Sequence, residues 1–281
     1  MPNKGSKVKF AFSSNAFRGY SLVDTIHILA DLGYEGIEIM ADTPHAFPPE
    51  LTDRNFAAIS EALRKNEMEV SNINAFMLWA IGDTWHPSWI EKDPEQRRKR
   101  VEHTRSCIDL ASRLGASTIS TEPGGPLDGM DEERAVELFK EGLLSIQEHA
   151  REKGVRILIE PEPDLLIENS SQFVQFMEGM DREVFGLNFD IGHFYCVDED
   201  PAALVKKLRD DICHFHLEDI ASSRVHHHLM PGDGAIDLPD VLRQIDKIGY
   251  QGFVTVELYP YEEKPVDAAR QALAWFRDFS L

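Results

Sequence analysis

Acidic and imidazole side chains recur where apolar segments of this chain end. The segment GLNFDIGHFY ends an apolar run with Asp190 and places His193 three residues later. The segment ICHFHLED holds His214 and His216 at alternating positions, so both would point to one face of a strand. Two glutamates stand at matching places, Glu160 in RILIEP and Glu257 in FVTVEL. These residue types are ligands of divalent metal ions, provided that the fold brings them together.

A shared cation would explain why several carboxylates end neighbouring segments. Buried carboxylates are costly unless they are paired or bound to metal, and converging ones repel one another until some take up protons. A divalent ion removes that repulsion. Two glutamates, one aspartate and one histidine suit Mn²⁺, Co²⁺, Mg²⁺ or Zn²⁺ better than a thiolate-seeking metal. The alternative is that each is a solvated loop residue or a partner of a helix cap.

The segments that carry these residues alternate between apolar strands and amphipathic helices. LADLGYEGIEIM and IDKIGYQGFVTVEL share a plan in which a helix ends at glycine and a β-branched run follows, as in a repeating βα unit. The predicted strands are 8–14, 36–40, 69–75, 117–121, 156–161, 186–190, 212–217 and 253–258. The predicted helices are 21–33, 52–66, 94–114, 131–153, 170–180, 200–209, 238–248 and 265–278.

Eight such units predict an α/β protein with a (β/α)₈ TIM barrel and a single domain over residues 1–281. The length is just above the roughly 250 residues typical of this fold. A doubly wound open sheet is the rival, but FSSNAFRG follows the first strand where a G-x-G-x-x-G motif would stand. Active sites of these barrels lie at the C-terminal ends of the strands, where the residues above are found.

Composition excludes several classes of protein. The net charge of −20 disfavours nucleic-acid binding, because such a surface repels phosphates. No apolar run approaches the roughly 18 residues of a membrane span, and the N-terminal segment does not resemble a secretory signal. The three cysteines form no CxxC pair, which favours a reduced, cytoplasmic setting.

Several motifs together resemble the sugar phosphate isomerase/epimerase-like superfamily, which has the xylose-isomerase-like TIM barrel. They are LIEPEP, FDIGH, HFHLED, HHHLMPGDGAID and VTVELY, and the resemblance runs from the first strand to the last. That superfamily includes ketose 3-epimerases, inosose dehydratases and apurinic endonucleases. The resemblance implies that one divalent ion, manganese among the candidates, is held by Glu160, Asp190, His216 and Glu257.

The resemblance also implies that Glu160 and Glu257 act as acid and base on opposite faces of a sugar. A cation on a ketose carbonyl acidifies the neighbouring C–H, so one glutamate removes the proton and the other returns one through an enediolate. This describes a metal-dependent isomerase or epimerase of carbohydrate metabolism. A dehydratase acting on an inosose or a dehydroshikimate-like compound would use the same groups. A non-catalytic carbohydrate-binding barrel is a third alternative.

An apurinic endonuclease is disfavoured because its three-zinc set is incomplete. The resemblance places His226 where that branch has an aspartate. That branch also has histidines after earlier strands, whereas this chain has Asn74 after the third strand and Glu122 after the fourth. No P-loop is present and TEPGGPLDG is an acidic loop, so we expect an unphosphorylated sugar, polyol or cyclitol as the substrate.

The residues expected to bind substrate lie in loops after the strands. The long loop 76–96 carries three tryptophans, which could cover a sugar ring, anchor the loop or form a subunit interface in a homodimer or homotetramer. His226 and His228 could also chelate a second metal, or be solvated. The expected substrate-binding residues are His193, Arg224, His228, Trp79 and Glu162.

Overall fold

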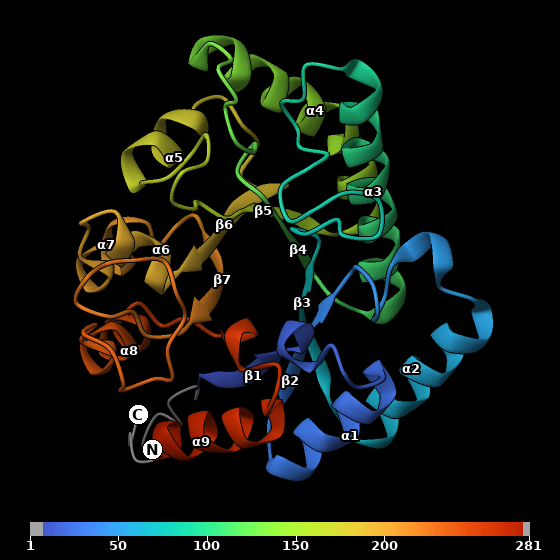
Figure 1. The fold of residues 1–281 in the computed structure, drawn as a ribbon, viewed down its shortest axis with the longest axis vertical. Helices are drawn as coiled ribbons and strands as arrows, with labels where there is room; N and C mark the ends of the chain where they lie inside the picture. The colour runs from blue at the N-terminus through green and yellow to red at the C-terminus, as the bar shows by residue number, and fades with distance from the viewer. Residues whose placement is uncertain (1–7, 278–281) are drawn as a thin grey trace, which may run out of the picture.

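Eight parallel strands close into a barrel in the computed structural model, which describes residues 8–277 (Figure 1). Each strand pairs with the next in sequence, and β8 pairs with β1. The strands are β1 (Lys9–Ser13), β2 (Gly36–Met40), β3 (Glu69–Asn74), β4 (Thr118–Thr121), β5 (Arg156–Ile159), β6 (Phe185–Asp190), β7 (Ile212–Leu217) and β8 (Phe253–Val256). The predicted TIM barrel is confirmed, and all eight predicted strands are present.

Helices surround the barrel (Figure 1). They are α1 (Leu22–Leu32), α2 (Asp53–Lys65), α3 (Pro94–Leu114), α4 (Glu132–Lys153), α5 (Ser170–Phe176), α6 (Ile191–Cys196), α7 (Pro201–Lys207), α8 (Leu238–Lys247) and α9 (Pro265–Arg277). Short 3₁₀ turns are η1 (Ser14–Phe17), η2 (Pro48–Glu50) and η3 (Tyr259–Tyr261). The sequence did not predict α6, which starts directly after β6.

Local signals explain where the helices begin and end. Ser21 and Thr52 precede α1 and α2, and their hydroxyls accept hydrogen bonds from Asp24 N and Asn55 N. Gly33 ends α1 with φ of 101°, a left-handed conformation that suits glycine. Among residues 8–277, no helix is both long and apolar enough to cross a membrane.

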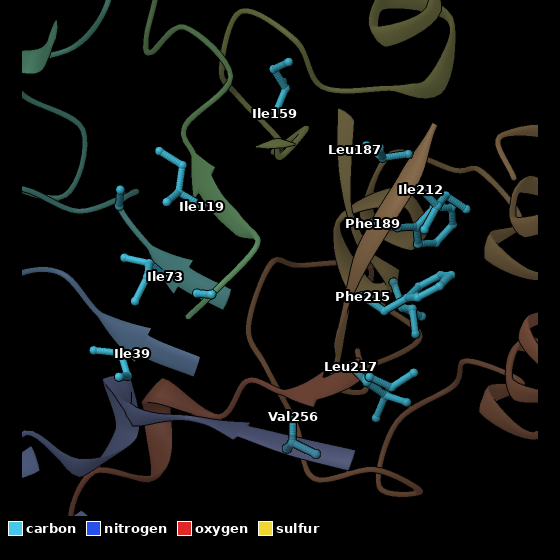
Figure 2. Close-up of a cluster of buried hydrophobic side chains, with 14 of the residues drawn as sticks. Ile39, Ile73, Ile119, Ile159, Leu187, Phe189, Ile212, Phe215, Leu217 and Val256 are labelled. Atoms are coloured by element: carbon cyan, nitrogen blue, oxygen red, sulfur yellow. The ribbon is translucent and has the colours of Figure 1, made fainter. Parts of the chain in front are cut away.

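The two faces of the strands carry different side chains. Buried apolar residues, including Ile39, Ile119, Phe189 and Phe215, point away from the barrel centre towards the helices (Figure 2). The neighbouring positions face the interior and are mostly polar, as for Glu38, Asn72, Asn188, Asp190, His214 and His216, all of which are buried. The strand period of two residues therefore separates an apolar core from a polar barrel interior.

Candidate metal centre

Four predicted ligands meet at the C-terminal end of the barrel. Each offers one atom, and these atoms lie within 4.8 Å of one another in a buried group that we name the four-residue cluster: Glu160, Asp190, His216 and Glu257. His216 Nδ1 is 2.8 Å from Glu160 Oε1 and 3.7 Å from Glu257 Oε2. The same nitrogen is 3.7 Å from Asp190 Oδ2. The structure therefore brings together the residues that the sequence placed at strand ends.

Strand register accounts for this convergence. Asp190 and His216 are register partners on the adjacent strands β6 and β7. Glu160 directly follows β5, and Glu257 directly follows β8. Asp190 also caps α6, because its Oδ1 accepts a 2.8 Å hydrogen bond from His193 N. The cap fixes the carboxylate, so its second oxygen faces the cluster.

The charges of the cluster shift the pKa values of its members. Burial alone would lower the pKa of His216, but the carboxylates of Glu38, Glu160 and Glu257 raise it well above its usual value. Burial raises the pKa of the Glu257 carboxyl well above its usual range, against the lowering effect of His216. These shifts favour protons where the carboxylates crowd together, and a divalent cation could take the place of those protons.

The donor set fits a divalent cation. Glu160 Oε2 and Asp190 Oδ2 are buried and have no hydrogen-bond partner among residues 8–277. Buried carboxylate oxygens without partners are costly, so both atoms are suited to an additional positive ligand. Three carboxylates and one imidazole are the oxygen and nitrogen donors that ions such as Mn²⁺ and Zn²⁺ accept.

Glu38 is a buried carboxylate of the site that sequence reasoning missed. Its Oε2 lies 2.7 Å from His216 Nε2 and accepts a 2.9 Å hydrogen bond from Asn72. A carboxylate at Nε2 holds a proton on that nitrogen and leaves Nδ1 turned to the cluster. Burial opposes ionisation, but the charge of His216 lowers the pKa of Glu38 to about 2. The sequence signal that could have identified Glu38 is its place as a charged residue within the apolar segment GIEIM.

Glu218 was also missed, although it follows β7 directly in HFHLED. Its Oε1 accepts a hydrogen bond from Gly192 N, and its Oε2 is buried without a partner among the described residues. Burial and the charge of Asp190 raise the pKa of Glu218 well above its usual value. Asp190, Glu218 and His228 form a further group whose ligand atoms lie close together.

A cavity of about 640 Å³ opens above the cluster. Asn15 and Asn74 lie on its floor, where their Nδ2 atoms are 2.8 and 3.4 Å from Glu257 Oε1. Of the expected substrate-binding residues, four line this cavity: Trp79, Glu162, His193 and His228. Burial raises the pKa of Glu162 well above its usual value, and the charge of Glu160 adds to that effect.

Arg224 does not line the cavity, in contrast to the expected contact with substrate. Its guanidinium lies 3.9 Å from the ring centroid of Tyr195 and 3.0 Å from Asp198 Oδ1. The next residues, Val225 and His226, face the cavity instead. The sequence did not predict the orientation of Arg224, because side chains in an irregular loop do not follow the periodic pattern of a helix or strand.

Three histidines form a second group beside the cluster, composed of His193, His226 and His228. His226 Nε2 lies 3.1 Å from His228 Nε2. His193 Nδ1 is 2.9 Å from the Pro161 carbonyl oxygen, and His228 Nδ1 is 2.9 Å from that of Glu257. Burial lowers the pKa of His226 to about 2 and that of His228 to about 4, so both rings are neutral and can donate an electron pair.

The tryptophans of the long loop divide between two roles. Trp79 and Trp85 line the cavity. Trp89 is buried, donates a 3.0 Å hydrogen bond to Thr121 Oγ1 and packs on Phe139. The loop is therefore anchored at Trp89 while its earlier part forms a wall of the cavity.

Comparison with known proteins agrees with this architecture. The family model described as xylose isomerase-like TIM barrel matches residues 26–279. Fructoselysine 3-epimerase of Shigella flexneri is 27% identical over 256 residues, covering 88% of this chain and 89% of that protein. Inosose dehydratase of Clostridium perfringens is 22% identical over 282 residues, covering 89% of this chain and 87% of that protein.

Solved structures give the same barrel. The IolI protein with a binding zinc atom superposes with a TM-score of 0.81 at 20% identity, covering 98% of this chain and all of that one. A D-tagatose 3-epimerase-like protein superposes with a TM-score of 0.79 at 23% identity, covering 96% of this chain and 99% of that one. At these identities the structural likeness establishes the fold.

Proposed function

Because the chain belongs to the xylose isomerase-like TIM barrel family, we propose that it is a metal-dependent epimerase or isomerase of unphosphorylated sugars. It would act at the carbon next to a carbonyl group. The observation that carries this proposal is the four-residue cluster with its two partnerless carboxylate oxygens. Relatives named as an epimerase and a dehydratase support the same kind of chemistry.

Glu160, Asp190, His216 and Glu257 would hold one divalent ion, with Mn²⁺, Co²⁺, Mg²⁺ and Zn²⁺ as candidates. The zinc in the solved IolI structure supports a metal of this kind. When bound, such an ion polarises a carbonyl and acidifies the adjacent C–H bond. Glu38 would orient His216 through its hydrogen bond to Nε2.

Two glutamates would move the protons. Glu160 and Glu257 follow β5 and β8, so they approach the cavity from strands that β6 and β7 separate. One would take the proton from one face of the carbon, and the other would return a proton to the opposite face. Asn15 and Asn74 hold Glu257 Oε1, which fixes this carboxylate towards the cavity.

The charge of the cavity supports a substrate without phosphate. Within residues 8–277, neither a lysine nor an arginine is among the lining side chains, whereas Glu162 and Asp164 are. A phosphate group would therefore find neither a lysine nor an arginine side chain in the cavity to bind it.

A dehydratase is the second candidate, because relatives named inosose dehydratase align with most of the chain. The first proton removal would be the same in both reactions. They differ in whether the carbon regains a proton or the neighbouring carbon loses hydroxide.

Incubation of the metal-loaded protein with ketoses and inososes in deuterated water separates these reactions. Epimerisation incorporates deuterium with no loss of water, whereas dehydration gives a product that is one water lighter, and mass spectrometry distinguishes the two. Glu160→Gln and Glu257→Gln should each lower turnover by at least about a hundredfold. Glu122→Gln is the matched control, since Glu122 is a buried glutamate outside the cavity. Turnover retained in both site variants would refute the two-glutamate assignment.

A further inference from the structure

One wall of the cavity is apolar and does not belong to the barrel core. A second hydrophobic cluster consists of Met40, Phe76, Met77 and Leu165, with Trp79 packed against it. All of these except Met40 line the cavity, and we name them the apolar wall: Phe76, Met77, Trp79 and Leu165. The hydroxyl groups of a sugar find no hydrogen-bonding partner on Phe76, Met77 and Leu165, and Trp79 Nε1 already donates a 3.0 Å hydrogen bond to Thr84 Oγ1.

Three exposed apolar side chains also line the cavity. Trp85 is 42% exposed, Val225 is 65% exposed and Tyr259 is 38% exposed, and all three line the cavity. They come from three different loops, after β3, β7 and β8. Exposed apolar groups that line one cavity indicate an interaction site rather than a folding requirement.

The size of the cavity exceeds that of a monosaccharide. At roughly 30 Å³ for each water molecule, about 640 Å³ would hold about 20 waters. A hexose has only about 12 non-hydrogen atoms, each no larger than a water molecule, and so leaves a large part of this space free. A sugar ring would lie on the polar part of the lining, which we name the polar floor: Asn15, Glu160, His193, His228 and Glu257. The apolar wall is then the part of the lining left for the remaining space.

We propose that the substrate is a substituted sugar, with its ring on the polar floor and an uncharged apolar substituent against the apolar wall. This proposal rests on the proposed function for the sugar half of the molecule. An alkyl or aryl group attached away from the reacting carbon fits the chemistry of the wall. An anionic substituent does not fit, because neither a lysine nor an arginine within residues 8–277 lines the cavity, whereas Asp164, the residue before Leu165, does.

Calorimetry on the Mn²⁺-loaded protein tests this with D-fructose ethers that carry methyl or phenyl at O1 or at O6. We expect the phenyl ether to bind at least about tenfold more tightly than the methyl ether at one of these positions. Leu165→Ser and Val225→Ser should lower the phenyl affinity more than the methyl affinity. Leu144→Ser, at an exposed leucine outside the cavity, is the matched control and should keep the parent ratio.

Equal affinities of the two ethers at both positions would overturn the proposal. A ratio that stays unchanged in both Leu165→Ser and Val225→Ser would also overturn it. The proposal would also be overturned if the protein sediments as a dimer, Val225→Ser dissociates that dimer and no ether is preferred. The exposed apolar groups would then form a contact with a second copy of the chain. Deuterium exchange into the methyl ethers separates the two proposals. Exchange without a substituent preference keeps the epimerase and rejects the substituted sugar. A preference without exchange on any ether keeps the substituted sugar and rejects the epimerase.

Discussion

Replacing Glu38 by glutamine tests whether a carboxylate behind His216 controls the metal centre. Glu38 is fully buried, and its Oε2 lies 2.7 Å from His216 Nε2. The amide of Asn72 donates to the same oxygen at 2.9 Å, so the side chain has one orientation. Glutamine has the same shape but no negative charge. Its oxygen could still accept from Nε2, so the ring would keep its place while its basicity falls.

The expected loss follows from what such carboxylate–histidine pairs contribute. Removing the partner of a ligating histidine typically weakens metal binding about 10–100-fold, which corresponds to about 1.4–2.7 kcal/mol. The upper part of that range applies here, because Glu38 and His216 are both shielded from solvent and little water is present to screen the charge.

Zinc titration against a chromophoric chelator would measure this affinity in the metal-free parent protein, Glu38→Gln and Glu122→Gln. Glu122 is also a fully buried glutamate, but it pairs with Arg100 at 3.4 Å and lies outside the four-residue cluster. Thermal unfolding confirms that each variant is folded before titration. A Glu38→Gln affinity within a factor of about two of the parent would refute the role of this carboxylate.

Three other substitutions test the framework. Burial and the nearby Arg100 lower the pKa of His103 to about 3. On acidification the unfolded chain takes up a proton at this histidine before the folded protein does, so His103 alone should contribute about 2 kcal/mol to the stability lost between about pH 7.5 and about pH 5. His103→Gln should make the loss measured by urea unfolding smaller by that amount, and an unchanged slope would contradict the assignment. Phe139→Ala removes a buried ring that stacks on Phe176, so it should lower the free energy of unfolding by about 3–5 kcal/mol in the same assay. A smaller decrease would show that the core collapses into the space. Arg100 donates hydrogen bonds to the carbonyl oxygens of Ala75, Phe76 and Pro87, and a lysine cannot make all three. In Arg100→Lys, amide hydrogen exchange should therefore accelerate in residues 76–93 and nowhere else.

The barrel could be predicted because each βα unit repeats the same local signals. Ser21 and Thr52 mark helix starts, Gly33 marks a helix end, and β-branched runs follow. Each signal acts over a few residues, so a sequence shows it directly. The short helix Ile191–Cys196 was missed because six residues are too few to display a helical period.

The site was partly predictable for the same reason. The four-residue cluster stands at strand ends, and parallel strands of a barrel place their ends at one rim. Glu38 lies within β2 and reaches His216 across the barrel interior, from a strand 178 residues away and not adjacent in the sheet. No local pattern encodes that contact. Arg224 and Trp89 likewise depend on loop conformation, which turns one towards Tyr195 and the other into the core.

Hydrogen bonding differs between the four-residue cluster and the polar side chains below it in the barrel. Below the cluster, His214 is bonded to Asn188 at 2.8 Å and to Thr255 at 2.7 Å. No buried side-chain atom of these three lacks a partner within the described residues. One layer higher, Glu160 Oε2 and Asp190 Oδ2 do lack partners. This arrangement suits a binding site, because the hydrogen-bonded side chains below hold the ligand atoms in place and the partnerless carboxylate oxygens gain from a cation.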